Sequence, residues 1–198
     1  YIQVQKVEAN FERSENNILE KQIIFGDRGI IYDRNKRELA WNKKADIIVE
    51  PEQITSEDTR GVPSLQRIYL SPGFSHVLGY VSYPIKDKTG NYWQQEFIGK
   101  DGLEKVYNDK IKGENGAKII ETNALGEVYS ENIVNTPKQG RELITSIDSR
   151  IQTQLYSIIK NSSEINSFSG GAGILMNVEN GEILASTSFP EYDSEILS

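Results

Sequence analysis

Apolar residues in this chain fall mostly into short runs with the alternating period of β-strands. Residues 21–42 predict two strands around a turn at Asn35 and Lys36, because β-branched and aromatic residues flank these turn residues. A positive φ at Lys36 would cost about 1 kcal/mol relative to glycine. Residues 172–188 predict a hairpin around Asn180 and Gly181, a pair that strongly favours hairpin turns. Further strands are expected in residues 1–7, 141–148 and 117–134, the last around a turn at Leu125 and Gly126.

Two stretches have the helical period instead. In residues 101–113, one apolar face is formed by Leu103, Val106, Tyr107 and Ile111. Asp101 and Glu104 have the spacing of a capping box, and Gly113 suits the left-handed position after a helix. Residues 149–163 predict a longer amphipathic helix whose inward residues are Ile151, Leu155, Ile158 and Ile159. The mixture, with more strand than helix, indicates an α+β fold.

The composition excludes several classes of protein. The 198 residues carry a net charge of −7 and no basic stripe, which argues against nucleic-acid binding. There is no cysteine, so disulfides, thiolate nucleophiles and cysteine-based zinc sites are absent. No P-loop, EF-hand or His-Glu-x-x-His pattern occurs, and we expect no cofactor or metal. No run of 18 apolar residues marks a transmembrane helix.

Three short strings resemble the motifs of penicillin-reactive enzymes. They are Ser157 to Lys160 (SIIK), Ser130 to Asn132 (SEN) and Lys88 to Gly90 (KTG). Their order is the reverse of the order in such enzymes, and KTG lies in a polar turn. Ser157 and Lys160 point away from the apolar face of the predicted helix, so we interpret them as solvated. These strings therefore do not predict an acylation site.

Single residues with possible chemistry favour structural roles. His76 is the only histidine, and a serine–histidine triad would have to use it. Without a nearby nucleophile motif, a buried or half-buried histidine bonded to backbone is favoured. Arg28, Asp33 and Arg34 lie in a β-rich region, where arginine forks can clamp neighbouring strands through carboxylates. The alternative is a ligand site, which the absence of a neighbouring nucleophile disfavours.

Five ordered segments resemble class B penicillin-binding proteins. They are RGIIYDRNKRELAWN, RIYLSPGFSHVLGYVS, GKDGLEKVYNDKIKGENG, GRELITSIDSRIQTQL and AGILMNVENGEILASTSFPEYD, which cover most of the chain from Arg28 to Asp193. The resemblance implies structural roles for the motif positions, which are Arg28, Gly29, Asp33, Arg34, Arg67, His76, Gly79, Tyr80, Gly102, Glu104, Tyr107 and Gly113. Lys36 and Leu70 depart from the family pattern, which has Gly and Pro there.

The resemblance implies a division of the chain into two domains. Residues 1–146 would form the elongated, β-rich pedestal, also called the dimerisation domain, with a short or missing head around residues 51–66. Residues 147–198 resemble only the first helix and hairpin of the transpeptidase domain. The family's catalytic Ser-x-x-Lys follows the segment matched by SFPEYD. We therefore expect no catalytic residue in this chain.

The implied parent is a bacterial peptidoglycan D,D-transpeptidase with one membrane anchor upstream of Tyr1 and its bulk in the periplasm. The implied partners are a membrane glycosyltransferase of the shape, elongation and division family and cell-wall scaffold proteins. β-Lactams would bind only to the missing catalytic domain. The alternative is a small self-contained serine acyl-enzyme that uses Ser157 and Lys160, or His76. A third interpretation is a standalone binding protein without a catalytic domain.

Overall fold

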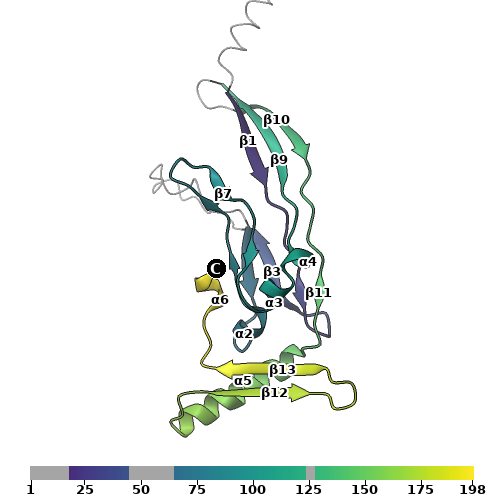
Figure 1. Cartoon of the computed structure of the whole chain (residues 1–198), viewed down its shortest axis with the longest axis vertical. Helices are drawn as coiled ribbons and strands as arrows, with labels where there is room; N and C mark the ends of the chain where they lie inside the picture. The colour runs from purple at the N-terminus through teal and green to yellow at the C-terminus, as the bar shows by residue number, and fades with distance from the viewer. Residues whose placement is uncertain (1–17, 45–64, 124–127) are drawn as a thin grey trace, which may run out of the picture. The chain divides into compact units, whose positions relative to one another are not determined.

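The computed structural model describes residues 18–44, 65–123 and 128–198 (Figure 1). The predicted strand in residues 1–7, the turn at Leu125 and Gly126, and residues 51–64 of the predicted head lie outside these ranges. The described residues form two compact units, one of residues 18–26 and 114–138, the other of residues 27–113 and 139–198. No helix in the described ranges is long and apolar enough to span a membrane.

The first unit is a three-stranded antiparallel sheet. Its order is β1 (Ile18–Ile24), β9 (Gly116–Thr122) and β10 (Val128–Asn135), which confirms the strands expected in residues 117–134. Ile120 is buried and lies opposite Glu20 on one side and Glu131 on the other. Register shifts in β10 after Val128 and before Asn135 interrupt its pairing, a common feature of edge strands.

The second unit is built on a four-stranded sheet. Its order is β11 (Leu143–Ile144), β2 (Ile31–Tyr32), β3 (Glu38–Lys44) and β4 (Leu65–Tyr69). Strand β11 pairs with β2 in parallel, and the other pairs are antiparallel. The turn between β2 and β3 is where the sequence predicted it, and Lys36 has a positive φ of 62°. The buried core of this unit consists of Ile31, Leu39, Ala40, Tyr69, Phe74, Leu78, Ile111 and Ile147.

The helix predicted in residues 101–113 is broken into two. Helix α3 (Gly102–Val106) and helix α4 (Asn108–Ile111) are separated by Tyr107. The predicted capping box is wrong: Asp101 makes no side-chain cap, and the carboxylate of Glu104 bonds to two arginines instead. The left-handed conformation predicted for Gly113 is also wrong, because the chain leaves α4 in extended backbone at Lys112 and Gly113 has no positive φ. The inward position predicted for Val106 is wrong too, since it is 74% exposed.

Short elements connect α3 to the sheet. Helix α2 (Ser75–Leu78) precedes two small antiparallel ladders, one between β5 (Val81–Ser82) and β8 (Ile98–Gly99), the other between β6 (Ile85–Lys86) and β7 (Tyr92–Gln94). The turn between β6 and β7 contains the KTG string, as predicted, and the carboxylate of Asp87 accepts hydrogen bonds from within this turn. KTG therefore lies in a surface turn.

The C-terminal part contains helix α5 (Ser149–Ile165), strands β12 (Gly171–Met176) and β13 (Ile183–Phe189), and helix α6 (Ser194–Leu197). Figure 1 shows α5 lying along the β12–β13 hairpin. The hairpin therefore covers the apolar face that the sequence predicted for this helix. The helix and hairpin predictions are confirmed. The prediction that Ile158 points inward is wrong, since it is 55% exposed. The hairpin loop is longer than a two-residue turn, because Asn177 bonds to Glu182 across it and only Gly181 has a positive φ.

Candidate functional site

Two arginines and one glutamate form a buried charge cluster in the second unit. Glu104 from α3 is fully buried, and Arg28 and Arg67 are 1% and 2% exposed. Arg28 Nε lies 2.5 Å from Glu104 Oε2, and Arg67 Nε lies 2.9 Å from Glu104 Oε1. Each carboxylate oxygen therefore has its own guanidinium partner.

Neutral acceptors bind the remaining guanidinium nitrogens of this cluster. Arg28 donates to the carbonyl of Phe97 and to Oδ1 of Asn108, and Arg67 donates to the carbonyl of Gly29 and to Oδ1 of Asn42. Burial lowers the pKa of Arg28, and the charge of Glu104 opposes this shift. Buried charges are tolerated only when paired and hydrogen-bonded, and this cluster meets both conditions. Because every guanidinium nitrogen has a partner, the cluster acts as a structural clamp.

The clamp differs from the one that the sequence suggested. Arg28 does bind a carboxylate, but the carboxylate belongs to a helix 76 residues away and not to a neighbouring strand. Arg34 lies elsewhere, on the surface, with its guanidinium 3.3 Å from Glu182. The sequence singled out Glu104 for a capping box and marked Arg67 only through the family resemblance. A local signal existed for Arg67, which lies among apolar residues in LQRIYL, but not for Glu104, whose neighbours include Lys105 and Asp101.

Asp33 forms a second polar centre, at the turn between β2 and β3. One carboxylate oxygen accepts from the backbone of Asn35 and Arg37, at 2.7 and 2.9 Å. The other accepts from the backbone and hydroxyl of Ser149, the first residue of α5, at 3.2 and 2.7 Å. Burial alone would raise the pKa of Asp33, but these hydrogen bonds outweigh it and hold the pKa below its ordinary value. The carboxylate thus ties the sheet to α5.

Asp148 completes this joint from the other side. Its carboxylate caps α5 by accepting from the backbone of Arg150 and Ile151, which satisfies free N–H groups at the helix start. The same carboxylate accepts from the side-chain amide of Asn35, at 2.9 Å. Burial opposes ionisation here too, but the hydrogen bonds lower the pKa of Asp148. We call Asp33, Asn35, Asp148 and Ser149 the turn–helix joint.

The motif glycines allow close backbone contacts. Gly79 and Gly102 both have positive φ, of 76° and 54°. A Cβ atom on Gly79 would lie 1.9 Å from the carbonyl oxygen of Asp101, and one on Gly102 would lie 2.5 Å from the carbonyl oxygen of Val77. Helices α2 and α3 therefore touch through backbone atoms that a side chain would separate.

His76, Tyr80 and Tyr107 lie apart from the charge cluster. His76 is exposed, and its Nδ1 lies 3.1 Å from the hydroxyl of Ser188. The predicted backbone-bonded histidine is thus wrong, because α2 presents this side chain to β13. The rings of His76 and Tyr80 both meet Tyr192 edge to face. Tyr107 packs partly buried against the core. No carboxylate among the described residues bonds to His76, so the geometry lacks the third member of a triad.

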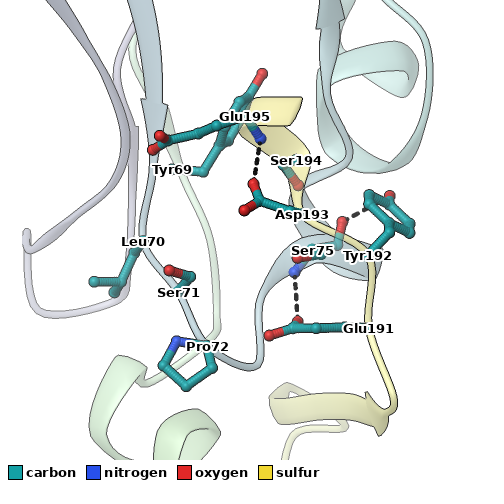
Figure 2. Close-up of a pocket in the computed structure, with 10 residues that line it drawn as sticks. All are labelled: Tyr69, Leu70, Ser71, Pro72, Ser75, Glu191, Tyr192, Asp193, Ser194 and Glu195. Carbon is teal, nitrogen blue, oxygen red and sulfur yellow. Dashed lines mark hydrogen bonds between the residues drawn. The ribbon is translucent and has the colours of Figure 1, made fainter. Parts of the chain in front are cut away.

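A small pocket of about 290 Å³ lies between the end of β4 and the segment after β13 (Figure 2). It is lined by Tyr69, Leu70, Ser71, Pro72, Ser75, Glu191, Tyr192, Asp193, Ser194 and Glu195. The carboxylate of Glu191 points to the backbone of Ser75, and that of Asp193 caps α6. Burial and the neighbouring Asp101 raise the pKa of Tyr192 to about 12.

Within the described ranges no cluster of potential ligands could hold a metal ion.

Ser157 and Lys160 have separate partners. The hydroxyl of Ser157 donates to the carbonyl of Thr153 one turn earlier, and the ammonium of Lys160 lies 4.0 Å from Glu164. Both are the ordinary surface contacts of a solvated helix. Neither contact joins the hydroxyl of Ser157 to the ammonium of Lys160.

The comparisons with known proteins agree with the fold. Residues 61–145 match the model of the penicillin-binding protein dimerisation domain. The chain is 26% identical to peptidoglycan D,D-transpeptidase FtsI of Buchnera aphidicola, over 91% of this chain and 40% of that protein. It is 36% identical to penicillin-binding protein 3 of Bacillus subtilis, over 60% of this chain and 17% of that protein.

Solved structures show the same fold. A chain from "Structural coordination of polymerization and crosslinking by a peptidoglycan synthase complex" matches with a TM-score of 0.63 and 20% identity, covering 98% of this chain and 43% of that one. Penicillin-binding protein 2X from Streptococcus thermophilus matches with a TM-score of 0.62 and 21% identity, over 90% of this chain and 36% of that one.

The α+β fold and these matches make the chain similar to the penicillin-binding proteins. More narrowly, residues 61–145 match the penicillin-binding protein dimerisation domain, and the relatives and solved structures confirm the resemblance to class B penicillin-binding proteins seen in the sequence. The chain spans less than half the length of the relatives it matches.

Proposed function

We propose that this chain is the non-catalytic pedestal of a bacterial cell-wall D,D-transpeptidase, and that it positions the catalytic domain. Residues 1–146 would be the pedestal and residues 147–198 the start of the transpeptidase domain. The names of the relatives support the reaction, since several are peptidoglycan D,D-transpeptidases. No cofactor is part of this proposal.

The observation that carries the proposal is the turn–helix joint. Asp33 holds Ser149 at the first residue of α5 through two hydrogen bonds, across 116 positions of sequence. Hydrogen bonds to an ionised carboxylate are stronger than hydrogen bonds between neutral groups, and they have a fixed direction. The sheet that carries Asp33 is itself clamped by the buried charge cluster. A firm base and a defined attachment point are what a positioning domain needs.

The proposal places the acyl-transfer chemistry outside these 198 residues. Its support is that Ser157 and Lys160 engage Thr153 and Glu164 and not each other. An intact mass after incubation with a penicillin tests this part. We expect no adduct, whereas a penicilloyl adduct mapped to Ser157, and lost in Ser157→Ala, would make the chain an acyl-enzyme. A catalytically complete penicillin-binding protein is the positive control.

The proposal also includes a membrane-anchored, extracytoplasmic location and a membrane glycosyltransferase partner. Its support is that one structural neighbour comes from a peptidoglycan synthase complex. Binding of the purified chain to a detergent-solubilised glycosyltransferase of the shape, elongation and division family tests the partner. We expect saturable binding that empty micelles do not show. Equal retention on empty micelles would contradict the partner assignment.

A further inference from the structure

The backbone of Gly73 is held by three residues of the C-terminal part. Its N–H donates to Oε1 of Glu191 at 2.6 Å. Its carbonyl accepts from Nε2 of Gln152 at 2.6 Å and from the hydroxyl of Thr187 at 2.9 Å. These partners come from α5, from β13 and from the segment after β13. Both backbone polar atoms of Gly73, which lies just before α2, are thus bonded to residues that follow residue 147.

Gln152 links this contact to the hairpin. It is fully buried, and its Nε2 also donates to the carbonyl of Ser186 at 2.7 Å. Its Oε1 accepts from the backbone N–H of Ser186 at 2.7 Å. Both amide protons and the amide oxygen therefore have partners, so the side chain is fixed in one orientation. A buried amide that lost these bonds would be strongly disfavoured, which makes the arrangement specific.

Space around Gly73 is equally restricted. Its φ is +99°, and a Cβ atom there would lie 2.8 Å from Cβ of Tyr156 on α5. The turn therefore approaches the helix as closely as backbone can. This contact is separate from the turn–helix joint, where Asp33 holds the first residue of α5. One attachment point leaves an element free to pivot, whereas two on different elements define its orientation.

We propose that Gln152, Thr187 and Glu191 form an orienting latch on Gly73, which fixes the angle of α5 and β13 on the sheet of the second unit. The inference deepens the proposed function and rests on it: these are positioning residues for the transpeptidase domain that the pedestal would carry. The latch acts through shape and hydrogen bonds. It requires no ligand, because the four residues, with Ser75 and Ser186, supply these hydrogen bonds themselves.

Residual dipolar couplings of backbone amides, measured by NMR on the whole 198-residue chain, test the latch. In the wild type, we expect the couplings of α5, β13 and the strands β2 to β4 to fit a single alignment tensor. In Gln152→Leu, we expect α5 and β13 to need a separate tensor, and the amide of Ser186 to exchange about tenfold faster. Gln154→Leu, on the exposed side of the same helix, is the matched control and should behave as wild type.

Thr187 provides a finer comparison. Thr187→Val removes the hydroxyl and keeps the shape, so we expect a partial version of the Gln152→Leu effect. Thr187→Ser keeps the hydroxyl and should restore the wild-type couplings. A single tensor retained in both Gln152→Leu and Thr187→Val would overturn the latch. Equal acceleration of exchange in β3 and β4 would also overturn it, because Gln152 would then support only global stability.

The couplings do not report partner binding or penicillin acylation, so the latch and the proposed function fail in different ways. If the variants kept a single alignment tensor while the chain still bound the glycosyltransferase, only the orienting role would be wrong. A penicilloyl adduct on Ser157, with the expected change in couplings, would remove the pedestal function and leave the latch as a structural feature.

Discussion

Arg28 and Glu104 are 76 positions apart in the sequence, and Nε of one lies 2.5 Å from Oε2 of the other in the protein interior. Arg67 binds the second oxygen of the same carboxylate. The carboxylate thereby joins β4, α3 and the segment before β2 in one contact. The stability of the second unit should therefore depend on this carboxylate more than on any surface ion pair.

Glu104→Gln tests this dependence. The substitution keeps the shape of the side chain and leaves two buried guanidiniums without a counter-charge, so we expect a loss of about 3–5 kcal/mol in the free energy of unfolding. Urea denaturation followed by circular dichroism measures it. Glu96→Gln is the control, because Glu96 is largely exposed and 3.8 Å from Lys112, and its loss should be about 0–1 kcal/mol. Similar losses in the two variants would contradict the role of the cluster.

Asp33 should make stability depend on pH. Its pKa is lower in the folded protein than in the unfolded chain, so its contribution is fully present above the unfolded pKa, about 4. The contribution is then lost as the pH falls through the folded pKa. Asp33→Asn should cost about 2 kcal/mol at pH 7, because the amide cannot replace all four accepted bonds.

The measurement is urea denaturation of wild type and Asp33→Asn from pH 7 to pH 3. We expect the difference between the two proteins to shrink as the pH falls below about 4. Asp109→Asn is the control, since the side chain of Asp109 is 90% exposed, and it should differ little from wild type at either pH. A difference for Asp33→Asn that stays constant over this range would exclude the carboxylate charge as its origin.

Lys36→Gly should stabilise the protein. Lys36 has a φ of 62°, a conformation that costs a non-glycine residue about 1 kcal/mol. Glycine removes this strain but loses more chain entropy on folding, so we expect a net gain of about 0.5 kcal/mol. Lys36→Ala keeps the strain and is the matched control. Thermal unfolding measures both variants, and an equal midpoint for the two would contradict the strain argument.

Gly79→Ala should be far more harmful than Gly90→Ala, although both glycines have positive φ, of 76° and 86°. A Cβ atom on Gly90 meets open space, so only backbone strain of about 1 kcal/mol applies. A Cβ atom on Gly79 would collide with the backbone of Asp101, which adds about 1–3 kcal/mol. Urea denaturation of both variants measures the difference. Equal losses would show that α2 and α3 separate without cost.

The sequence alone determined the elements whose signals are local. The hairpin around Gly181 and the helix from Ser149 were predictable, because turn residues and apolar period act over a few neighbouring residues. The turn at Asn35 and Lys36 was predictable in the same way, whereas the positive φ of Lys36 was known only from the structure. The family resemblance placed Arg28, Arg67 and Glu104 among twelve motif positions, but it did not say that these three touch.

Tertiary structure decided which of these residues meet. Glu104 was expected to cap its own helix, yet burial between two arginines left its carboxylate unavailable, and the predicted helix breaks at Tyr107. Ile158 was expected inside, but Gln152 and Tyr156 occupy the buried face of α5 because Gly73 and Ser186 offer backbone partners to Gln152 there. Such contacts join residues 34 to 79 positions apart, and no local pattern encodes them.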